Sequence, residues 1–404
     1  MASTQPHVLK WGIMATGAIA ETFTKDLLTD PQYRDVSDVR HEVVAAASSR
    51  SSDRAAGFLR AVGAPGSAAA YGSYAELVRD ANVDIVYVAT PHSHHFQNAM
   101  LALHGGKHVL CEKALTVTAA QARKLFATAQ ARQLFFLEAV WTRFFPLSIK
   151  VRELIKAGAI GTVYRVIADL SLGQDDAQGK GNKGGGLLFA DAHRMVNPEL
   201  AGGALLDLGI YSLTWLFQTL YHVQAEAEKE APLVVAAVNK YRTGVDEMTT
   251  VVLQFPRHGS QGIGLTNLRV GTDPDGHNSA GAAIKIQGAL GEIDVMGPAY
   301  RPLQYRVVKK DGGGQVEVVD CPVPQDRDST RSWGGHGMFW EADECARCVR
   351  DGKLESETLP WSESVVIMEV MEAALKQGGV EYPDRITTDV FDPQSPLNTG
   401  GEMG

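Results

Sequence analysis

The first third of the chain alternates short apolar, β-branched runs with longer amphipathic stretches. The runs predict strands at Val8–Met14, His41–Ser48, Val83–Thr90, His108–Cys111 and Leu134–Leu137. The stretches predict helices at Ala18–Leu28, Ser52–Val62, Tyr74–Asp80, His94–His104 and Ala119–Arg132. Repeated strand–helix units imply a parallel sheet with right-handed crossovers. We therefore expect a doubly wound α/β domain over residues 1–145.

The pattern changes after Pro146. One helix is predicted at Leu147–Ala157, and a second at Phe339–Arg350. Most of the remaining apolar runs predict strands, at Val163–Leu170, Leu233–Tyr241, Met248–Phe255, Ile263–Val270, Ala282–Gln287, Glu292–Val295, Leu303–Lys309 and Val316–Val319. Strands joined by turn signals predict a large open, mainly antiparallel sheet. We expect a second α/β domain over 146–384, followed by an extended C-terminal tail over 385–404.

Length and charge agree with this division. A chain of 404 residues is long enough for two domains. Its 38 Lys and Arg against 47 Asp and Glu give a net charge of −9, which argues against a nucleic-acid partner.

The location expected from the sequence is the cytoplasm. The first residues show neither a basic nor an apolar leader region. The longest apolar stretch, Gly209–Tyr221, is shorter than the ~20 residues that a membrane helix needs, so we expect no membrane partner. Four cysteines are too few for a disulfide scaffold and suit a reducing compartment.

The end of the first predicted strand carries a candidate dinucleotide-binding loop. Gly12 and Gly17 match the outer glycines of G-x-G-x-x-G, but Met14 occupies the middle position. The middle glycine normally lets the backbone approach a pyrophosphate, so Met14 must lie back or turn its side chain away. The following helix would present its N-terminus to the phosphates. The candidate cofactor residues here are Gly12, Met14, Ala15, Thr16, Gly17, Ala18 and Ile19.

The end of the second predicted strand favours NADP over NAD. An NAD enzyme usually has a carboxylate there for the ribose hydroxyls, and this chain has Ser49 and Arg50, with Arg54 one helical turn later. Hydroxyl and guanidinium groups can hold a 2′-phosphate. The alternative is an ordinary solvated loop.

Two further strand ends belong to the same expected crevice. The loop with Ala89, Thr90, Pro91, His92, His94 and His95 follows one strand, and Glu112 and Lys113 follow the next. The histidines could indicate a metal hydrolase, but the other ligands of such a site are missing, as they are around the Cys345 and Cys348 pair. We expect no metal, and we expect the histidine loop to line the dinucleotide. Lys113 could donate to a substrate oxygen.

Together, several motifs resemble the Gfo/Idh/MocA oxidoreductase family, and in particular its dimeric dihydrodiol dehydrogenase branch. They are G-x-M-x-T-G, Ala89–His95, Glu112–Ala114, Glu138–Pro146 and Gly202–Tyr211. The resemblance spans nearly the whole chain and includes the sugar-oxidising members of the branch. Two departures stand out, since E-K-P is E-K-A here, with Ala114, and the usual catalytic histidine is Tyr211.

The resemblance implies a site and a reaction. Its catalytic residues would be Lys113, Asp207 and Tyr211. The reaction would be NADP-dependent oxidation of D-xylose, and of other aldoses, at C1 to the lactone by hydride transfer. Tyr211 would act as the base, and because a free phenol has a pKa near ~10, a cation such as Lys113 would be required to assist it.

The resemblance also implies a sugar pocket and a partner. The pocket residues would be Trp141, Arg143, Asp169, His193, Arg194 and Asn197, with Asp207 and Tyr211, and Trp141 and Arg143 would also contact the cofactor. A homodimer would form through the open sheet. Two alternatives stay open at this point: a trans-1,2-dihydrodiol dehydrogenase, and an NADP-sensing regulator without catalytic activity.

Overall fold

The computed structural model describes residues 5–176, 186–324 and 335–399, which divide into two compact units. The first unit contains Met1–Trp141, Val323–Ser364 and Thr387–Gly404, and the second contains Thr142–Pro322 and Val365–Ile386. The first unit is therefore assembled from three separate stretches of sequence. The chain first passes from one unit to the other after Trp141, near the change of pattern at Pro146.

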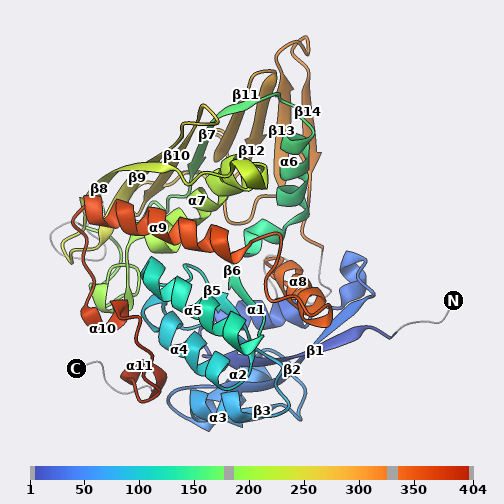
Figure 1. The fold of residues 1–404 in the computed structure, drawn as a ribbon, viewed down its shortest axis with the longest axis vertical. Coiled ribbons are helices and arrows are strands. Elements are labelled where there is room, and N and C mark those ends of the chain that lie inside the picture. The colour runs from blue at the N-terminus through green and yellow to red at the C-terminus, as the bar shows by residue number, and fades with distance from the viewer. Residues whose placement is uncertain (1–4, 177–185, 325–334, 400–404) are drawn as a thin grey trace. The chain divides into compact units, whose positions relative to one another are not determined.

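The first unit is built around a parallel sheet with strand order β3-β2-β1-β4-β5-β6 (Figure 1). Its strands are β1 His7–Met14, β2 Val39–Ala47, β3 Ala69–Tyr71, β4 Ile85–Val88, β5 His108–Glu112 and β6 Phe136–Ala139. The order of the strands reverses between β1 and β4, where doubly wound sheets bind ligands at the carboxyl ends of their strands. This fold confirms the predicted doubly wound domain.

Helices connect these strands, and three of them begin at a hydroxyl side chain. The helices are α1 Ala18–Leu27, α2 Ser52–Ala61, α3 Tyr74–Arg79, α4 His92–His104 and α5 Ala119–Arg132. Ser51, Ser73 and Thr118 accept hydrogen bonds from the first turns of α2, α3 and α5. Such caps satisfy N–H groups that have no partner within the helix.

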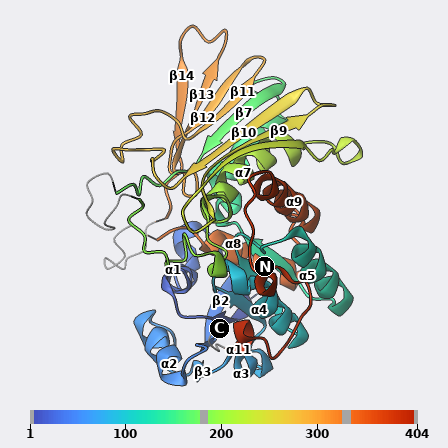
Figure 2. The ribbon, with the colours of Figure 1, turned by 90° about the vertical axis from the view of Figure 1, so that its left-hand side faces the viewer.

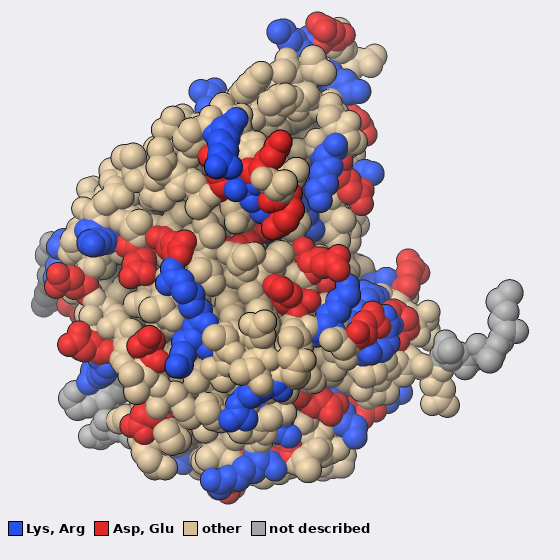
Figure 3. Space-filling view, in the orientation of Figure 1, with Lys and Arg blue, Asp and Glu red and all other residues tan. Residues whose placement is uncertain are grey.

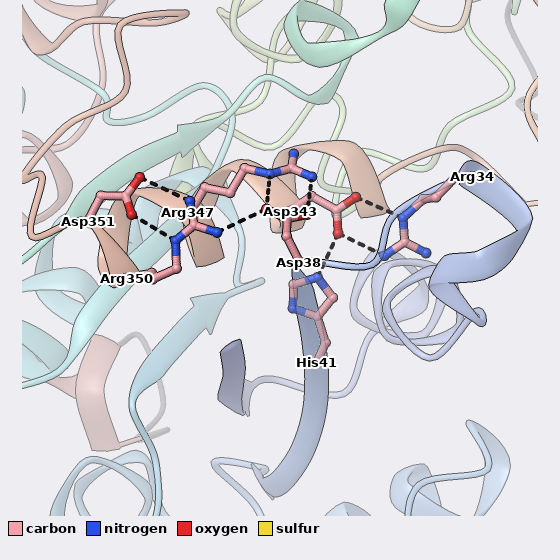
Figure 4. Close-up of polar contacts among 7 residues, drawn as sticks. All are labelled: Arg34, Asp38, His41, Asp343, Arg347, Arg350 and Asp351. Atoms are coloured by element: carbon pink, nitrogen blue, oxygen red, sulfur yellow. Dashed lines mark hydrogen bonds and ion pairs between the residues drawn. The ribbon is translucent and has the colours of Figure 1, made fainter. Parts of the chain in front are cut away.

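A late helix, α8 (Phe339–Arg350), packs against the N-terminal part of the same unit. Asp343 of α8 accepts two hydrogen bonds of 2.8 Å from Arg34 and lies 2.9 Å from Nε2 of His41 on β2 (Figure 4). The indole N–H of Trp11 donates to the other ring nitrogen of His41 at 3.1 Å. Since that nitrogen accepts, His41 is neutral with its proton on Nε2, which donates to Asp343. This buried network fastens α8 to β1 and β2.

The second unit contains an eight-stranded sheet with order β14-β13-β12-β11-β7-β10-β9-β8. Its strands are β7 Val163–Asp169, β8 Leu233–Lys240, β9 Asp246–Phe255, β10 Ser260–Asn267, β11 Ile284–Gly288, β12 Gly291–Val295, β13 Gln304–Lys309 and β14 Val316–Asp320. All neighbours pair antiparallel except β7 and β10. This confirms the large, mainly antiparallel sheet, and α6 (Pro146–Lys156) precedes it.

One helical run covers the centre of one face of this sheet. It consists of a π-helical turn at Leu205–Gly209, then α7 (Ile210–Leu216), then a second π-helical turn at Phe217–Tyr221. α7 packs on β7 and β10 (Figure 2), and Gly262 of β10 leaves room for the Leu216 side chain. The run is part of the one described helix, from Pro198 to Tyr221, that is long and apolar enough to span a membrane. Its most apolar window is 94% buried, so it is a core helix of this unit.

Three features were not predicted. β3 has only three residues, Ala-Ala-Tyr, which carry no strand signal. α9 (Trp361–Gln377) has no predicted counterpart. Of the tail predicted as extended, the part described contains the end of α10 (Asp384–Thr387) and the short helix α11 (Pro396–Thr399), whose Leu397 is buried. On the face shown in Figure 3, Lys and Arg are interspersed with Asp and Glu.

Candidate active site

The loop between β1 and α1 leaves its backbone accessible although Met14 replaces the middle glycine of the motif. Met14 is the last residue of β1 and its side chain is fully buried, so it turns away from the loop. The unusual backbone conformation falls on Ala15 instead, with φ at +87°, a region that residues other than glycine rarely adopt. A Cβ on Gly12 would lie 2.9 Å from a side-chain carbon of Val83, so any larger residue at this position would require Val83 to move.

Gly17 is the N-cap of α1. Because glycine has no side chain to cap the helix, the N–H groups of Ala18 and Ile19 are left for another acceptor. The helix dipole adds to the attraction for an anion at this end. The loop therefore has the backbone groups that a dinucleotide phosphate needs.

The candidate 2′-phosphate residues lie at the end of β2. Arg50 and Arg54 are exposed, and Ser49 is half-buried. Ser51, which the sequence analysis did not select, accepts from the N–H of Arg54 and caps α2. Arg50 thus precedes the N-terminus of α2 and Arg54 lies in its first turn, and exposed arginines near a helix N-terminus suit a phosphate.

The histidine loop after β4 forms the first turn of α4. Ala89, Thr90 and His92 are buried, while Pro91 and His94 are half-buried. His95 is 1% exposed, and its two ring nitrogens lie 2.8 Å from the carbonyl oxygen of Thr90 and 2.9 Å from that of Ala114.

His95 thereby joins the ends of β4 and β5. Burial lowers the pKa of His95 to about 4. A neutral ring donates to only one of the two oxygens. Its contacts place His95 between the loops rather than at their surface.

Lys113 follows β5 directly, next to a buried carboxylate. Glu112 accepts a hydrogen bond from the hydroxyl of Tyr87 through Oε1 and one of 3.2 Å from the backbone N–H of Lys113 through Oε2. Glu112 is 5% exposed. The peptide bond between Lys113 and Ala114 is cis. These contacts fix the backbone that carries Lys113.

In the second unit, the core helix carries Asp207 and Tyr211. Both residues lie in helical segments four positions apart, Asp207 in the π-helical turn and Tyr211 in the first turn of α7. Asp207 Oδ1 lies 2.8 Å from Nη1 of Arg194. The Tyr211 ring centroid is 5.9 Å from that of Tyr300. The structure thus brings together Arg194 and Asp207, two of the predicted pocket residues.

Three other pocket candidates of this unit make local contacts. Asp169 ends β7 and accepts from the Ser171 hydroxyl at 2.6 Å. Burial raises the pKa of Asp169, while hydrogen bonds from Ser171 and Thr272 act in the opposite direction. The ring of His193 stacks on Phe189 at 4.7 Å between centroids.

Asn197 has a capping role. Its side-chain oxygen accepts from the N–H of Glu199 at 2.9 Å, at the start of the short helix Pro198–Leu200.

Trp141 and Arg143 share one 3-10 turn, Trp141–Phe144, but belong to different units. Trp141 is 4% exposed, and its ring centroid lies 5.1 Å from that of His336. Arg143 is fully buried, and its carbonyl oxygen accepts from Arg152 at 3.0 Å.

The candidates are divided between the two units. The first unit holds the cofactor candidates Gly12–Ile19, Ser49–Arg54, Ala89–His95, Glu112, Lys113 and Trp141, and the second holds the remaining pocket residues with Asp207 and Tyr211. Within the described residues, no group of three or more His, Cys, Asp or Glu could hold a metal ion. Cys345 and Cys348 are both buried on α8, as one face of a helix would place them.

Sequence reasoning missed several residues that contact the candidates. Tyr87 lies in a uniformly apolar strand and gives no signal of its bond to Glu112. Tyr300 comes from a loop far along the chain. Asp246 of β9 is fully buried and accepts from the backbone of the core helix, which only the fold reveals.

Comparison with known proteins identifies the class. Residues 9–139 match the model of the oxidoreductase family with an NAD-binding Rossmann fold, and residues 148–293 match the GFO/IDH/MocA C-terminal domain. The chain belongs to the Gfo/Idh/MocA oxidoreductase family, which confirms the resemblance.

Among its relatives, the D-xylose 1-dehydrogenase (NADP⁺) of Hypocrea jecorina is 65% identical over 402 residues, covering 100% of both chains. The human trans-1,2-dihydrobenzene-1,2-diol dehydrogenase is 34% identical over 377 residues, covering 93% of this chain and 98% of its own.

Solved structures share the fold at lower identity. A levoglucosan dehydrogenase in complex with NADH and levoglucosan has a TM-score of 0.73 at 16% identity, covering 92% of this chain and 97% of its own. The 3-ketoreductase KijD10 of Actinomadura kijaniata, in complex with NADP and TDP-benzene, has a TM-score of 0.67 at 22% identity, covering 92% and 98%.

Proposed function

We propose that this chain oxidises D-xylose, and other aldoses, at C1 to the lactone with NADP as the acceptor. The observation that carries the proposal is the 65% identity over the full length of both chains to a D-xylose 1-dehydrogenase (NADP⁺). The residues of both units are compatible with this chemistry.

The first unit has groups suited to NADP. The uncapped N-terminus of α1 would hold the pyrophosphate, and Ser49, Arg50 and Arg54 would hold the 2′-phosphate. Bound NADP supplies the hydride acceptor at its nicotinamide C4.

The second unit would supply the base and bind the sugar. Tyr211 would remove the proton of the anomeric hydroxyl, so that the C1–H bond is cleaved as the C1–O double bond forms. Asp207, held by Arg194, would accept hydrogen bonds from sugar hydroxyls. Asp169, His193 and Asn197 are further candidates for the same pocket. Lys113, whose backbone is fixed by Glu112, would stabilise the phenolate form of Tyr211.

A second function is favoured by the 34% identity to the human dihydrodiol dehydrogenase. Both reactions remove a hydride and a proton from a CH–OH group, so a substrate comparison separates them. Initial rates of NADPH formation would be measured with D-xylose, D-glucose and benzene trans-dihydrodiol. The proposal expects the highest kcat/KM with D-xylose. A higher kcat/KM with the dihydrodiol would replace it with the alternative, and NADP binding without turnover of any of these substrates would favour a regulator.

We also propose a homodimer that forms through the open face of the eight-stranded sheet. Cross-strand neighbours on this face include Val235, Val252, Ile263 and Ile167, with Val318 at the far edge. Val235 is 64% exposed and Val318 is 52% exposed. Exposed apolar side chains on a sheet face are typical of a protein interface.

The dimer proposal is tested by Val235→Lys combined with Val318→Lys. These changes should shift the mass measured by sedimentation from a dimer to a monomer. A wild-type monomer at micromolar concentration would contradict it. The expected cytoplasmic location also stays a proposal, supported by the four free cysteines.

A further inference from the structure

We propose that Asp246 of β9 is a positioning residue that holds the core helix with Asp207 and Tyr211 against the turn with Arg194. Its effect on turnover rests on the proposed function, whereas its effect on the helix does not. All the residues concerned belong to the second unit.

Asp246 fixes the start of the core helix. Its side chain is fully buried, and Oδ2 accepts from the backbone N–H of Leu205 at 2.7 Å. The same oxygen accepts from the hydroxyl of Thr249 at 2.8 Å, which orients the carboxylate. Leu205 begins the π-helical turn that contains Asp207. A displacement of this N–H therefore moves Asp207 with it.

The second carboxylate oxygen lies against Gly203. A Cβ at that position would be 2.2 Å from Oδ1, and the φ of Gly203 is +128°, so both space and conformation require glycine. Oδ1 has no hydrogen-bond partner among the described residues, although it is buried. The close contact of Asp246 with this backbone explains why this chain has glycine at position 203.

The other glycine of the pair, Gly202, packs directly on the backbone of the turn that carries Arg194. A Cβ on Gly202 would lie 2.7 Å from the carbonyl oxygen of Arg194 and 2.8 Å from the N–H nitrogen of Asn197. The N–H of Gly202 donates to Asn197 O, and that of Gly203 donates to Met195 O, both at 2.9 Å. Arg194 and Asp207, which form an ion pair, are thus held from both sides of the glycine pair.

The C-terminal part of this unit supports the same junction. The Tyr382 hydroxyl donates to Gly202 O at 2.6 Å. It lies 3.2 Å from the Cβ position of Gly203. Asp246 and Tyr382 therefore enclose the two glycines.

The charge of Asp246 suits its position. Burial raises its pKa to about 6, against the opposing effect of the hydrogen bonds from Thr249 and Leu205. A carboxylate ionised at neutral pH interacts favourably with the N-terminus of a helix. Burying a carboxylate costs free energy of folding. Its role in positioning the helix would explain why the chain has a carboxylate here.

The test compares Asp246→Ala and Asp246→Asn with Glu247→Gln as the matched control. Glu247 is the adjacent carboxylate on β9 and pairs with Arg269 instead of the core helix. Four quantities would be measured on folded protein well below its melting temperature: kcat and KM for D-xylose, the Kd for NADP, and the rate of hydrogen exchange of residues 203–211.

Asp246→Ala should lower kcat about 100-fold, because small displacements of reacting groups have effects of this size. Asp246→Asn keeps an oxygen acceptor for Leu205 and should restore most of this loss, to within about tenfold of wild type. The Kd for NADP should not change in either variant. Exchange over 203–211 should rise in Asp246→Ala and stay at the wild-type level in Glu247→Gln.

Wild-type kcat together with wild-type exchange in Asp246→Ala would overturn the proposal. If Asp246→Ala does not fold, a kcat for Asp246→Asn about 100-fold below wild type, with unchanged exchange over 203–211, would overturn it equally, because turnover would then be lost without any displacement of the helix. If the wild-type enzyme does not turn over D-xylose, the proposed function fails, and the exchange measurement alone still decides the role of Asp246.

Discussion

Nη1 of Arg194 lies 2.8 Å from Oδ1 of Asp207, so a guanidinium that is 54% exposed holds a carboxylate that is 8% exposed. The pair contributes little to stability, because the arginine is largely in water. The ion pair instead orients the Asp207 carboxylate, which lies in the π-helical turn directly before the helix that carries Tyr211.

Replacing Arg194 should therefore weaken sugar binding more than it weakens the fold. We expect Arg194→Ala to raise KM for D-xylose about tenfold or more, with an unchanged Kd for NADP and a melting temperature close to wild type. Steady-state kinetics and thermal unfolding measure these quantities. Arg194→Lys keeps the charge and should show a smaller increase. An unchanged KM in Arg194→Ala would show that this pair does not organise the pocket.

Cofactor selection should depend on Arg50. Arg50→Ala removes a guanidinium from the proposed 2′-phosphate site, and we expect the Kd for NADP to rise about tenfold or more, while that for NAD stays constant. The ratio of the two Kd values is the readout. Asp53→Asn in the same exposed helix start serves as a control, because it changes local charge without removing a phosphate donor. A parallel rise for both cofactors would mean that Arg50 acts only on the loop.

The buried part of the network in Figure 4, formed by Arg34, His41 and Asp343, should be important for stability. Asp343→Ala leaves the buried guanidinium of Arg34 without its carboxylate, and we expect unfolding to become easier by about 3–5 kcal/mol. Asp351→Ala is the control at the C-terminal end of the same helix, since Asp351 pairs with Arg350 in solvent and should hardly change stability. Urea unfolding of the two variants compares them directly. Equal stabilities would contradict the role given to the buried network.

Glu138 should make stability depend on pH. Burial raises its pKa from 4.5 to about 7, with the charges of Glu112 and Glu363 acting in the same direction. The folded protein then binds a proton between these values that the unfolded chain releases, so stability from this group is present below about pH 4.5 and is lost as pH rises to about 7. The difference between the folded and unfolded pKa values of Glu138 corresponds to roughly 3 kcal/mol of stability.

Glu138→Gln removes this titration. Relative to wild type, the variant should gain stability by roughly that amount between about pH 4.5 and about pH 8, as measured by urea unfolding. The sign is opposite to that of His41, whose pKa is lowered by burial and whose protonation destabilises the fold as pH falls below about 6.5. A difference between wild type and Glu138→Gln that stays constant with pH would contradict the burial effect.

The strands of both units could be predicted because their apolar runs are long and β-branched. β3, with Ala69–Tyr71, could not, since its pairing with β2 depends on the sheet already formed. The sequence also could not predict that residues 323–364 belong to the first unit, because the contact of Asp343 with Arg34 joins residues 309 positions apart.

The candidate site was predictable where motifs are local. The β1–α1 loop and Lys113 follow from strand ends, but the assignment of strain to Ala15 rather than Met14 needed backbone angles. The sequence gives no sign of the role of Asp246, because its hydrogen-bond partner is the backbone N–H of Leu205, 41 residues away.

The central claim is that Tyr211 is the base in NADP-dependent oxidation of D-xylose. The most direct measurement is the initial rate of NADPH formation from D-xylose by wild type and by Tyr211→Phe, with the Kd for NADP measured on both. We predict rapid xylose-dependent reduction by wild type and a kcat about a thousandfold lower in the variant, with equal Kd values. Near-wild-type kcat in Tyr211→Phe would contradict the assignment of the base, and no xylose-dependent rate in wild type would contradict the function itself.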